Sequence, residues 1–434
     1  MVSRILSRRS LLVQTGSLAA GLATIGATSD QPQGDFGTPE TIDTQAAGPG
    51  KIESWLAMIP AALVETINRD RPLFWWADLK RQFESVGAPA FDAESNEFRN
   101  VILAATFHLG LDSMAFQPSI DEVFISTFGF SAFQTHETMR ISLAESNVLI
   151  FRGGMPIDDL AGIWEAVGFI RETSTSGIEI WSFGDDGMFD LGHEASTYFI
   201  DGMTNATILD ETVIFSNLFP NLESIANHRI EKGTSILDLY PFTDLLATLT
   251  EDIVAAVGLA GDYFELSSIV ESHQFSEPPR EIDPEISEPG VFPVPICGMF
   301  AITAGMIVSE VLPTDQPDLV LDLLVDGVES NVGVVESRLA FATPDEAETA
   351  SELVEDRWNS LQSLTVEEAL TDLMVLDASG TDDATPTIAT FDFQQLKNNR
   401  TWRDMILTKD LLAFAWVEDS LPQATPEATP SANG

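Results

Sequence analysis

The sequence predicts an α+β fold in which two ferredoxin-like units follow a helical N-terminal segment. One order of predicted elements, namely strand, helix, hairpin and further strand, occurs once on each side of a proline-rich stretch at 277–295. Hydrophobic residues make up 44% of the 434 residues, which is enough apolar material for compact cores. We therefore expect the helical segment and the first unit at 51–276, a linker at 277–295 and the second unit at 296–418. The similarity of the two units is explained either by an ancient duplication or by convergence.

The N-terminus has the pattern of a twin-arginine export signal over residues 1–29. Arg8 and Arg9 precede a moderately apolar stretch, rich in Gly and Ala, that extends to Ala27. It is shorter and less apolar than a membrane-spanning helix, which needs about 20 strongly apolar residues. The signal predicts an extracytoplasmic protein, secreted or in the cell envelope. A general secretion signal, or an uncleaved segment that remains as a membrane anchor, are the alternatives.

Two polar segments that contain proline flank the predicted folded body. Residues 30–50 are rich in Gly, Pro, Thr and Gln and predict a disordered spacer, and residues 419–434 predict a disordered Ala/Thr/Pro tail. In composition, these termini resemble those of uncharacterised twin-arginine-exported proteins from green non-sulfur bacteria. The resemblance is limited to the termini and implies no activity.

The body begins with helical periodicity. Apolar residues at helical spacing predict one helix from Trp55 to Ile67, a second from Asp78 to Val86, and a third over Asn96–Leu109. Between the first two, Phe74, Trp75 and Trp76 form a dense aromatic run. Its side chains pack in a core, or they form an exposed platform of the kind that binds sugars.

The first unit opens at 139–151, where an alternating pattern becomes continuously apolar, as in a buried strand. A helix over 156–167 then ends at Gly168, and a hairpin joins 169–173 to 177–183. The remaining predicted elements are strands at 196–200 and 207–216 and helices at 221–230 and 238–259.

The second unit contains a helix with a strong start signal. Thr343 and Glu346 form a capping box with Pro344 at the first helical position, and the predicted helix runs to Leu361. The other predicted elements are strands at 299–311, 319–325, 333–341, 373–376, 387–391 and 411–417 and a short helix at 402–406.

The chain is strongly acidic, with 68 Asp and Glu against 21 Lys and Arg and a net charge of −47. Nucleic acids and anionic membranes are bound through basic patches, so we expect no nucleic-acid partner and no membrane contact except through an uncleaved signal. Cations and basic partners are favoured. The acidic surface is typical of a soluble exported protein, or of a protein from salty surroundings in which counterions screen the repulsion.

The candidate metal site is an acidic loop between two predicted strands. Asp185, Asp186, Asp190, His193 and Glu194 fall within ten residues that also contain glycines. Calcium prefers several carboxylate oxygens on a flexible loop, so these residues are the candidate calcium ligands. The spacing is not that of an EF-hand, and a solvated connection between strands is the alternative.

No catalytic or cofactor-binding residue can be assigned from motifs. The single cysteine, Cys297, lies in an apolar stretch and is expected to be a buried structural thiol. The five histidines are far apart, and the phosphate-binding, dinucleotide-binding and serine-nucleophile motifs are absent. We therefore expect a non-catalytic exported protein that binds a ligand, a cation or an envelope partner. A hydrolase with a spatially assembled site and a structural or assembly factor are the alternatives.

Overall fold

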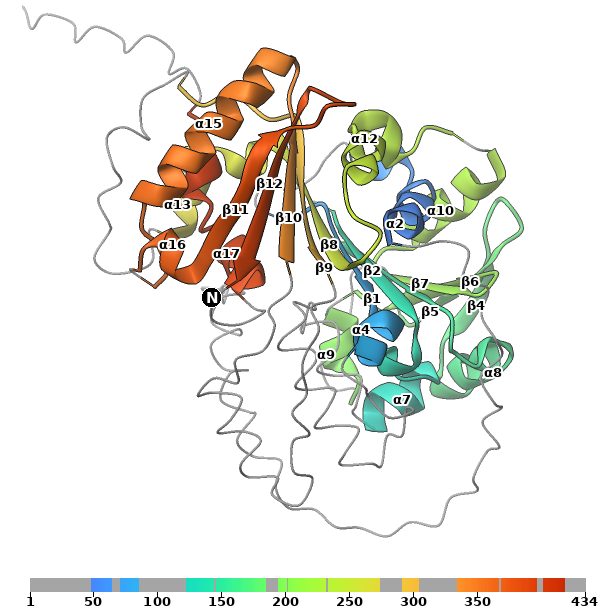
Figure 1. The fold of residues 1–434 in the computed structure, drawn as a ribbon. Helices are drawn as coiled ribbons and strands as arrows, with labels where there is room; N and C mark the ends of the chain where they lie inside the picture. The colour runs from blue at the N-terminus through green and yellow to red at the C-terminus, as the bar shows by residue number, and fades with distance from the viewer. Residues whose placement is uncertain are drawn as a thin grey trace, which may run out of the picture. The chain divides into compact units, whose positions relative to one another are not determined.

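A twelve-stranded sheet organises the described part of the chain (Figure 1). Its strands are β1 (Phe74–Asp78), β2 (Glu137–Ser142), β3 (Asn147–Arg152), β4 (Ile170–Thr173), β5 (Glu179–Ser182), β6 (Asn205–Leu209), β7 (Thr212–Ser216), β8 (Ile253–Ala260), β9 (Cys297–Thr303), β10 (Val334–Ala340), β11 (Met374–Thr381) and β12 (Ile388–Gln395). Across the sheet they follow the order β11-β12-β10-β9-β8-β1-β2-β3-β7-β6-β5-β4. Neighbouring strands are antiparallel throughout.

The structure is a computed structural model, and the residues it describes all belong to Thr44–Gly434. They are 48–64, 71–85, 122–143, 146–184, 194–200, 202–231, 233–273, 291–303, 334–366, 368–395 and 401–417. The mixture of helices with one antiparallel sheet confirms the predicted α+β class. The predicted signal and tail, residues 30–47 of the predicted spacer, the helix at 96–109, the strand at 319–325 and most of the linker lie outside the described residues. The last three residues of the predicted spacer, 48–50, are not disordered, because they form the start of α2.

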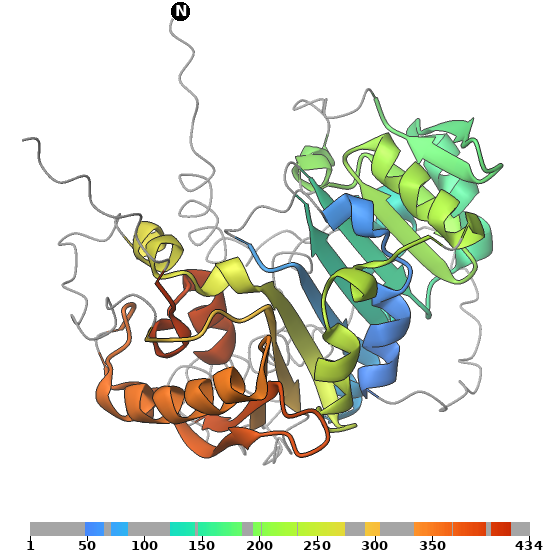
Figure 2. The ribbon, with the colours of Figure 1, turned by 90° about the horizontal axis from the view of Figure 1, so that it is seen from above.

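Helices cover both faces of the sheet (Figure 2). One face packs against α4 (Leu79–Ser85), α7 (Glu122–Phe128), α8 (Ile157–Val167) and α9 (Ser196–Ile200), and farther along against α13 (Leu266–His273), α15 (Pro344–Ser360), α16 (Leu370–Leu373) and α17 (Thr401–Thr408). The opposite face packs against α2 (Gly48–Leu56), α3 (Ala61–Val64), α10 (Phe219–Glu231), α11 (Ile236–Leu239) and α12 (Phe242–Ala247). The 3-10 helices are η3 (Ala132–Gln134), η4 (Gly261–Phe264) and η6 (Leu412–Phe414).

The aromatic run of β1 contributes to both cores. Successive side chains of a strand point to opposite faces, so Trp75 joins the core under α7 and α15, while Phe74 and Trp76 join the core under α2 and α12. All three side chains are buried. The packing interpretation of this run is therefore confirmed. Its secondary structure was not foreseen, because two-sided burial removes the alternation that marks a strand.

Several local predictions are confirmed by the backbone. Helix α8 ends at Gly168, whose φ of 112° lies in the left-handed region that favours glycine. The capping box of α15 is formed, since the Glu346 amide donates to the Thr343 hydroxyl and the Thr343 amide donates to the Glu346 carboxylate. The predicted hairpin corresponds to β4 and β5.

Two strand predictions were too long. Residues 139–151 form the hairpin β2–β3 and not one strand, and residues 207–216 are divided between β6 and β7. The sequence between these strands contains no glycine, so no break in the apolar pattern marked the turns. Asp210, at the second turn, has a φ of 54°, which Asp adopts more readily than most residues.

Three predictions of element type were wrong. The predicted strand at 196–200 is α9, the predicted helix at 238–259 gives way to β8, and the predicted strand at 411–417 contains only η6 and a bridge from Trp416 to Glu265. Strand β8 is rich in alanine, which favours helices, but its position between β1 and β9 buries it on both faces. Tertiary contacts thus override local preference.

The two predicted units contribute to one continuous sheet. The segment β1-β2-β3-α8 followed by β6-β7 gives the sheet order β1-β2-β3-β7-β6, and the segment β8-β9-β10-α15 followed by β11-β12 gives the matching order β8-β9-β10-β12-β11. The two halves meet at the antiparallel pair β1–β8. The ferredoxin-like character of each unit stays a prediction.

Candidate functional site

Charged residues from three adjacent strands meet at one edge of the sheet. Asp78 ends β1, Glu137 begins β2 and Arg152 ends β3, and the strand register places each directly beside the next. Both carboxylates are buried, with Asp78 2% and Glu137 7% exposed. Buried carboxylates require charged or hydrogen-bonding partners. The partners of Asp78 and Glu137 therefore determine whether these carboxylates hold the fold together or can bind a ligand.

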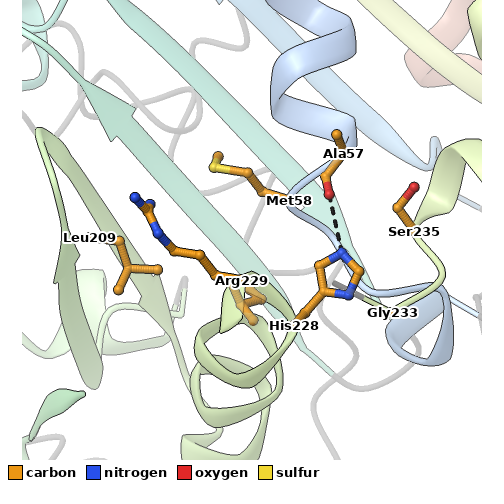
Figure 3. A pocket seen from close by; sticks show the side chains of 8 residues that line it. Ala57, Met58, Leu209, His228, Arg229, Gly233 and Ser235 are labelled. Carbon is orange, nitrogen blue, oxygen red and sulfur yellow. Dashed lines mark hydrogen bonds between the residues drawn. The ribbon is translucent and has the colours of Figure 1, made fainter. Parts of the chain in front are cut away.

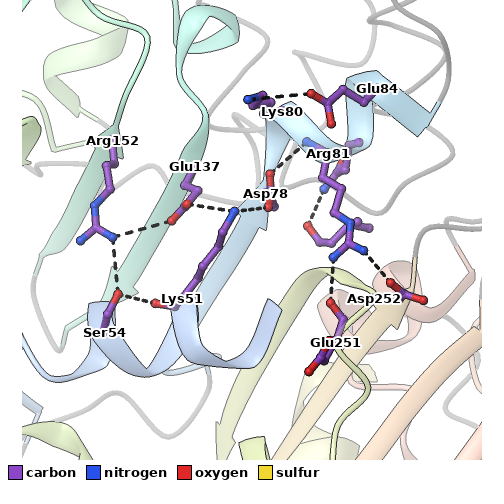
Figure 4. A network of polar contacts seen from close by, with 12 residues as sticks. Lys51, Ser54, Asp78, Lys80, Arg81, Glu84, Glu137, Arg152, Glu251 and Asp252 are labelled. Carbon is purple, nitrogen blue, oxygen red and sulfur yellow. Dashed lines mark hydrogen bonds and ion pairs between the residues drawn. The ribbon is translucent and has the colours of Figure 1, made fainter. Parts of the chain in front are cut away.

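Helix α2 supplies these partners (Figure 4). Lys51 Nζ lies 2.7 Å from Asp78 Oδ2 and 3.3 Å from Glu137 Oε1, and the indole Nε1 of Trp55 donates to Glu137 Oε2 at 2.7 Å. Burial by itself would lower the pKa of Lys51, but the hydrogen bond and charge of Asp78, together with Glu137, outweigh burial and raise it. Lys51 therefore stays charged and fixes α2 on the sheet.

Arg152 extends this network toward a neighbouring pocket. Its guanidinium lies 4.3 Å from the centre of the Trp55 ring and 3.8 Å from Glu137 Oε2. Its Nη2 lies 4.0 Å from the sulfur of Met58, which lines the pocket. Burial lowers the pKa of Arg152, but an arginine remains charged at any physiological pH.

The pocket lies between the end of α2, the β6–β7 hairpin and the C-terminal half of α10 (Figure 3). Its volume is about 380 Å³. It is lined by Ala57, Met58, Leu209, Ile225, His228, Arg229, Gly233 and Ser235. Most of the wall is apolar, and the polar groups come from α10 and from the turn that leads into α11.

Hydrogen bonds hold the polar groups of the pocket in place. A carbonyl oxygen can only accept, so His228 Nε2 donates to the Ala57 carbonyl at 3.2 Å. Arg229 pairs with Asp210 at the tip of the β6–β7 hairpin. Ser235 donates its amide and its hydroxyl to Asp238, and these bonds, the amide first, lower the pKa of Asp238. The pocket thus contains one guanidinium, one imidazole and one hydroxyl beside apolar walls.

The predicted calcium ligands are not assembled among the described residues. Asp185, Asp186, Asp190 and His193 lie outside the described ranges, and Glu194 is exposed in the turn before α9. Within those ranges, no group of three or more His, Cys, Asp or Glu side chains is placed to hold a metal ion. The calcium site stays a prediction.

Cys297 is fully buried in β9, as expected for a structural thiol. Burial raises its pKa well above the ordinary range, which keeps the sulfur protonated and unreactive. The thiol is therefore no candidate nucleophile in the folded chain.

Sequence reasoning missed the pocket because its residues come from four separate segments. Met58, Leu209 and Arg229 have no shared motif, and their spacing in the sequence carries no periodic signal. A hairpin turn at Asp210-Glu211 places Leu209 near Thr212, but this pair lacks the glycine or asparagine that marks such turns in a sequence.

Comparisons with known proteins add little to this picture. No protein-family model matches the chain, and no curated protein matches it. Among solved structures the chain is similar to TP0453: crystal form I at a TM-score of 0.33 and 9% identity, covering 86% of this chain and 100% of that one, and crystal form III at 0.29 and 8%, covering 81% and 97%. A likeness at this level indicates nothing about activity.

None of the helices in the described ranges combines the length and the apolar character that crossing a membrane requires.

Proposed function

We propose that the chain is an exported, non-catalytic protein of the cell envelope that binds a small ligand in the pocket between α2 and α10. The observation that carries the proposal is the composition of the pocket: Met58, Leu209 and Ile225 form apolar walls beside the polar Arg229 and His228. Ligand sites typically combine apolar walls with a few polar groups that orient the ligand, in volumes of about 300–1,000 Å³.

The bonds of the polar groups favour binding over catalysis. His228 Nε2 is committed to the Ala57 carbonyl, and the Ser235 hydroxyl is committed to Asp238. The bond from Ser235 to Asp238 belongs to the capping box that begins α11, so it serves the helix start and not the activation of a nucleophile. These side chains are therefore suited to orienting a ligand.

Export is supported by Arg8 and Arg9 ahead of the apolar stretch to Ala27. Replacing both arginines by lysine should leave the full-length protein in the cytoplasm when export is followed by cell fractionation. Unchanged delivery through the twin-arginine route would contradict this part of the proposal.

We further propose that β1–β7 and β8–β12, which divide the chain before β8 and not at the predicted linker 277–295, are ferredoxin-like α+β units that arose by duplication. The matching orders β1-β2-β3-β7-β6 and β8-β9-β10-β12-β11 support a common origin. A solved structure in which β1–β7 and β8–β12 do not superpose would contradict a duplication.

The ligand proposal is tested by filling the pocket. Ala57 is exposed at its mouth, so Ala57→Phe should block the pocket without disturbing a core. Ala166 is exposed on α8, outside the pocket, and Ala166→Phe is the matched control. The probe is 1-octanol, a neutral molecule with an apolar body, titrated by calorimetry and by protein-observed NMR.

We expect 1-octanol to bind the wild-type chain and the Ala166→Phe variant alike, and to bind the Ala57→Phe variant at least about tenfold more weakly. Equal binding by all three proteins, or no binding to the wild type by 1-octanol and by its charged counterparts octanoate and octylamine, would show that the pocket is not the ligand site.

A further inference from the structure

We infer that the ligand is a small aliphatic monocarboxylate whose carboxylate binds Arg229 in place of the side chain of Asp210. This inference rests on the proposed function and identifies the ligand class for the same pocket. Its basis is the arrangement of Arg229, the hairpin tip that carries Asp210 and the apolar walls between α2 and α10.

Arg229 is the charged group of the pocket best suited to bind a carboxylate. It lies in the last turn of α10, and Figure 3 shows its side chain extended along the pocket toward Leu209. Nη2 donates to Asp210 Oδ2, a bond that uses one nitrogen of the guanidinium. Guanidinium groups bind carboxylates through two parallel N–H bonds, so a ligand carboxylate can replace this single contact with a bidentate one.

The side chain of Asp210 binds Arg229 at the position where we expect the ligand carboxylate to bind. It begins the two-residue turn between Leu209 and Thr212, and its φ of 54° lies in the left-handed region that favours glycine. Among the described residues, the other non-glycine residue with a positive φ is Lys409. Because Asp adopts this conformation more readily than most residues, the hairpin turn holds the acid beside the arginine of the pocket at small cost.

The pair between Arg229 and Asp210 is open to exchange. The arginine side chain is 41% exposed and the aspartate side chain is 71% exposed. Exposed ion pairs contribute little to stability, so a ligand can displace Asp210 at small cost. Asp210 thereby acts as an internal competitor that is released when the ligand binds.

The local charge explains how a chain of net charge −47 can bind an anion. Arg152 lies behind Met58 at the pocket wall, and Arg229 is near enough to contribute to the lowered pKa of Arg152, after burial. Arg229 is the one guanidinium among the lining residues, whereas Arg152 does not line the pocket and lies 3.8 Å from Glu137 Oε2. A single lining cation favours a ligand with one negative charge, whereas the surrounding field repels polyanions.

The apolar walls of the pocket determine the chemistry of the part of the ligand beyond its carboxylate. Met58, Leu209 and Ile225 offer no hydrogen-bond partner except the weakly accepting sulfur of Met58, so the body of the ligand is aliphatic. Octanoate is the probe for this class. With 1-octanol and octylamine, it forms a set that shares one chain length and differs only in the charge of the head group.

The experiment compares the three probes on five forms of the full exported chain at matched ionic strength: wild type, Arg229→Gln, Asp210→Asn, and two controls. Arg171 and Glu179 form an exposed ion pair on the β4–β5 hairpin, outside the pocket. Arg171→Gln and Glu179→Gln therefore reproduce the changes in net charge without altering the pocket. Circular dichroism verifies that each variant is folded.

We expect octanoate to bind the wild type about tenfold more tightly than 1-octanol, because a charge-assisted hydrogen bond is gained. Arg229→Gln should remove that advantage, and Asp210→Asn should increase octanoate affinity by about threefold or more through loss of the competitor. The two control variants should bind octanoate as the wild type does. If Arg229→Gln does not fold, the gain in Asp210→Asn still tests the inference.

The outcomes separate this inference from the proposed function. If 1-octanol or octylamine binds as tightly as octanoate, and Arg229→Gln has no effect, the carboxylate inference is wrong while the pocket remains a ligand site. If no probe binds, or if Ala57→Phe leaves all binding unchanged, the proposed function fails and this inference fails with it.

Discussion

Trp55 donates its indole N–H to the carboxylate of Glu137 over 2.7 Å, although the two residues are 82 positions apart in the chain. The same carboxylate accepts from Lys51, and the ring of Trp55 supports the guanidinium of Arg152. One buried acid on β2 therefore fixes the orientation of α2. Helix α2 in turn ends at the mouth of the pocket, where Ala57 and Met58 follow its last turn.

Replacement of Glu137 by leucine should destabilise the fold strongly. The change leaves Trp55 Nε1 without its acceptor and removes a partner of the charged Lys51, so we expect the free energy of unfolding to fall by about 3 kcal/mol. Glu137→Gln keeps an acceptor for the indole and should cost less. Chemical denaturation measures both changes.

The matched control for this prediction is Glu179→Gln. Glu179 pairs with Arg171 at 3.0 Å, but both side chains are more than half exposed, so the change should cost less than about 1 kcal/mol. Equal losses in Glu137→Leu and Glu179→Gln would show that the buried network does not hold α2.

A pair of glycine substitutions tests the backbone beside the network. Gly154 has a φ of 74°, and a Cβ there would collide with the carbonyl oxygen of Gln134. Gly154→Ala should therefore lower the free energy of unfolding by at least about 2 kcal/mol. Gly162 lies within α8 with no atom near its potential Cβ, and Gly162→Ala should stabilise the chain by about 0.5–1 kcal/mol. Thermal unfolding of both variants should shift in opposite directions, and shifts of the same sign would disagree with the described backbone.

Local signals in the sequence predicted the elements that depend on local chemistry. The capping box of Thr343 and Glu346 identified α15, and Gly168 identified the end of α8, because caps and left-handed turns are set by neighbouring residues. Such features need no knowledge of distant contacts.

Other elements depend on distant contacts, and the sequence could not reveal them. Strand β8 was predicted as part of a helix, because its alanines favour helices and its burial on both faces removes any alternation. The pocket was missed for the same reason: Met58 and Arg229 meet only after α2 and α10 pack on one face of the sheet. The candidate calcium ligands, by contrast, were predicted from the local composition of 185–194 alone.

Added salt should stabilise the protein. At a net charge of −47 the folded chain repels itself, and the screening length shortens from about 10 Å at 0.1 M salt to about 3 Å at 1 M. We expect Tm to rise steadily as NaCl increases over this range, measured by differential scanning fluorimetry. KCl at equal concentrations is the control, because screening depends on ionic strength and not on the identity of the monovalent cation. A Tm that does not rise with either salt would show that charge repulsion does not limit stability.

Acid should destabilise the fold through His136, which precedes Glu137 in the chain. Burial lowers the pKa of His136 below 6.5, and the positive charge of Lys80 lowers it further, although Glu137 and Asp78 act in the opposite direction. As the pH falls below about 6.5, the unfolded chain takes up a proton at His136 that the folded chain does not accept. The contribution of His136 to stability is therefore complete above that pH, and it is lost as the pH falls toward the lower pKa of the folded state. Urea denaturation at several values between pH 5.5 and 8 should show a smaller loss of stability on acidification for His136→Gln than for the wild type. Parallel pH profiles for the two proteins would mean that His136 takes up its proton equally well in the folded and unfolded chain.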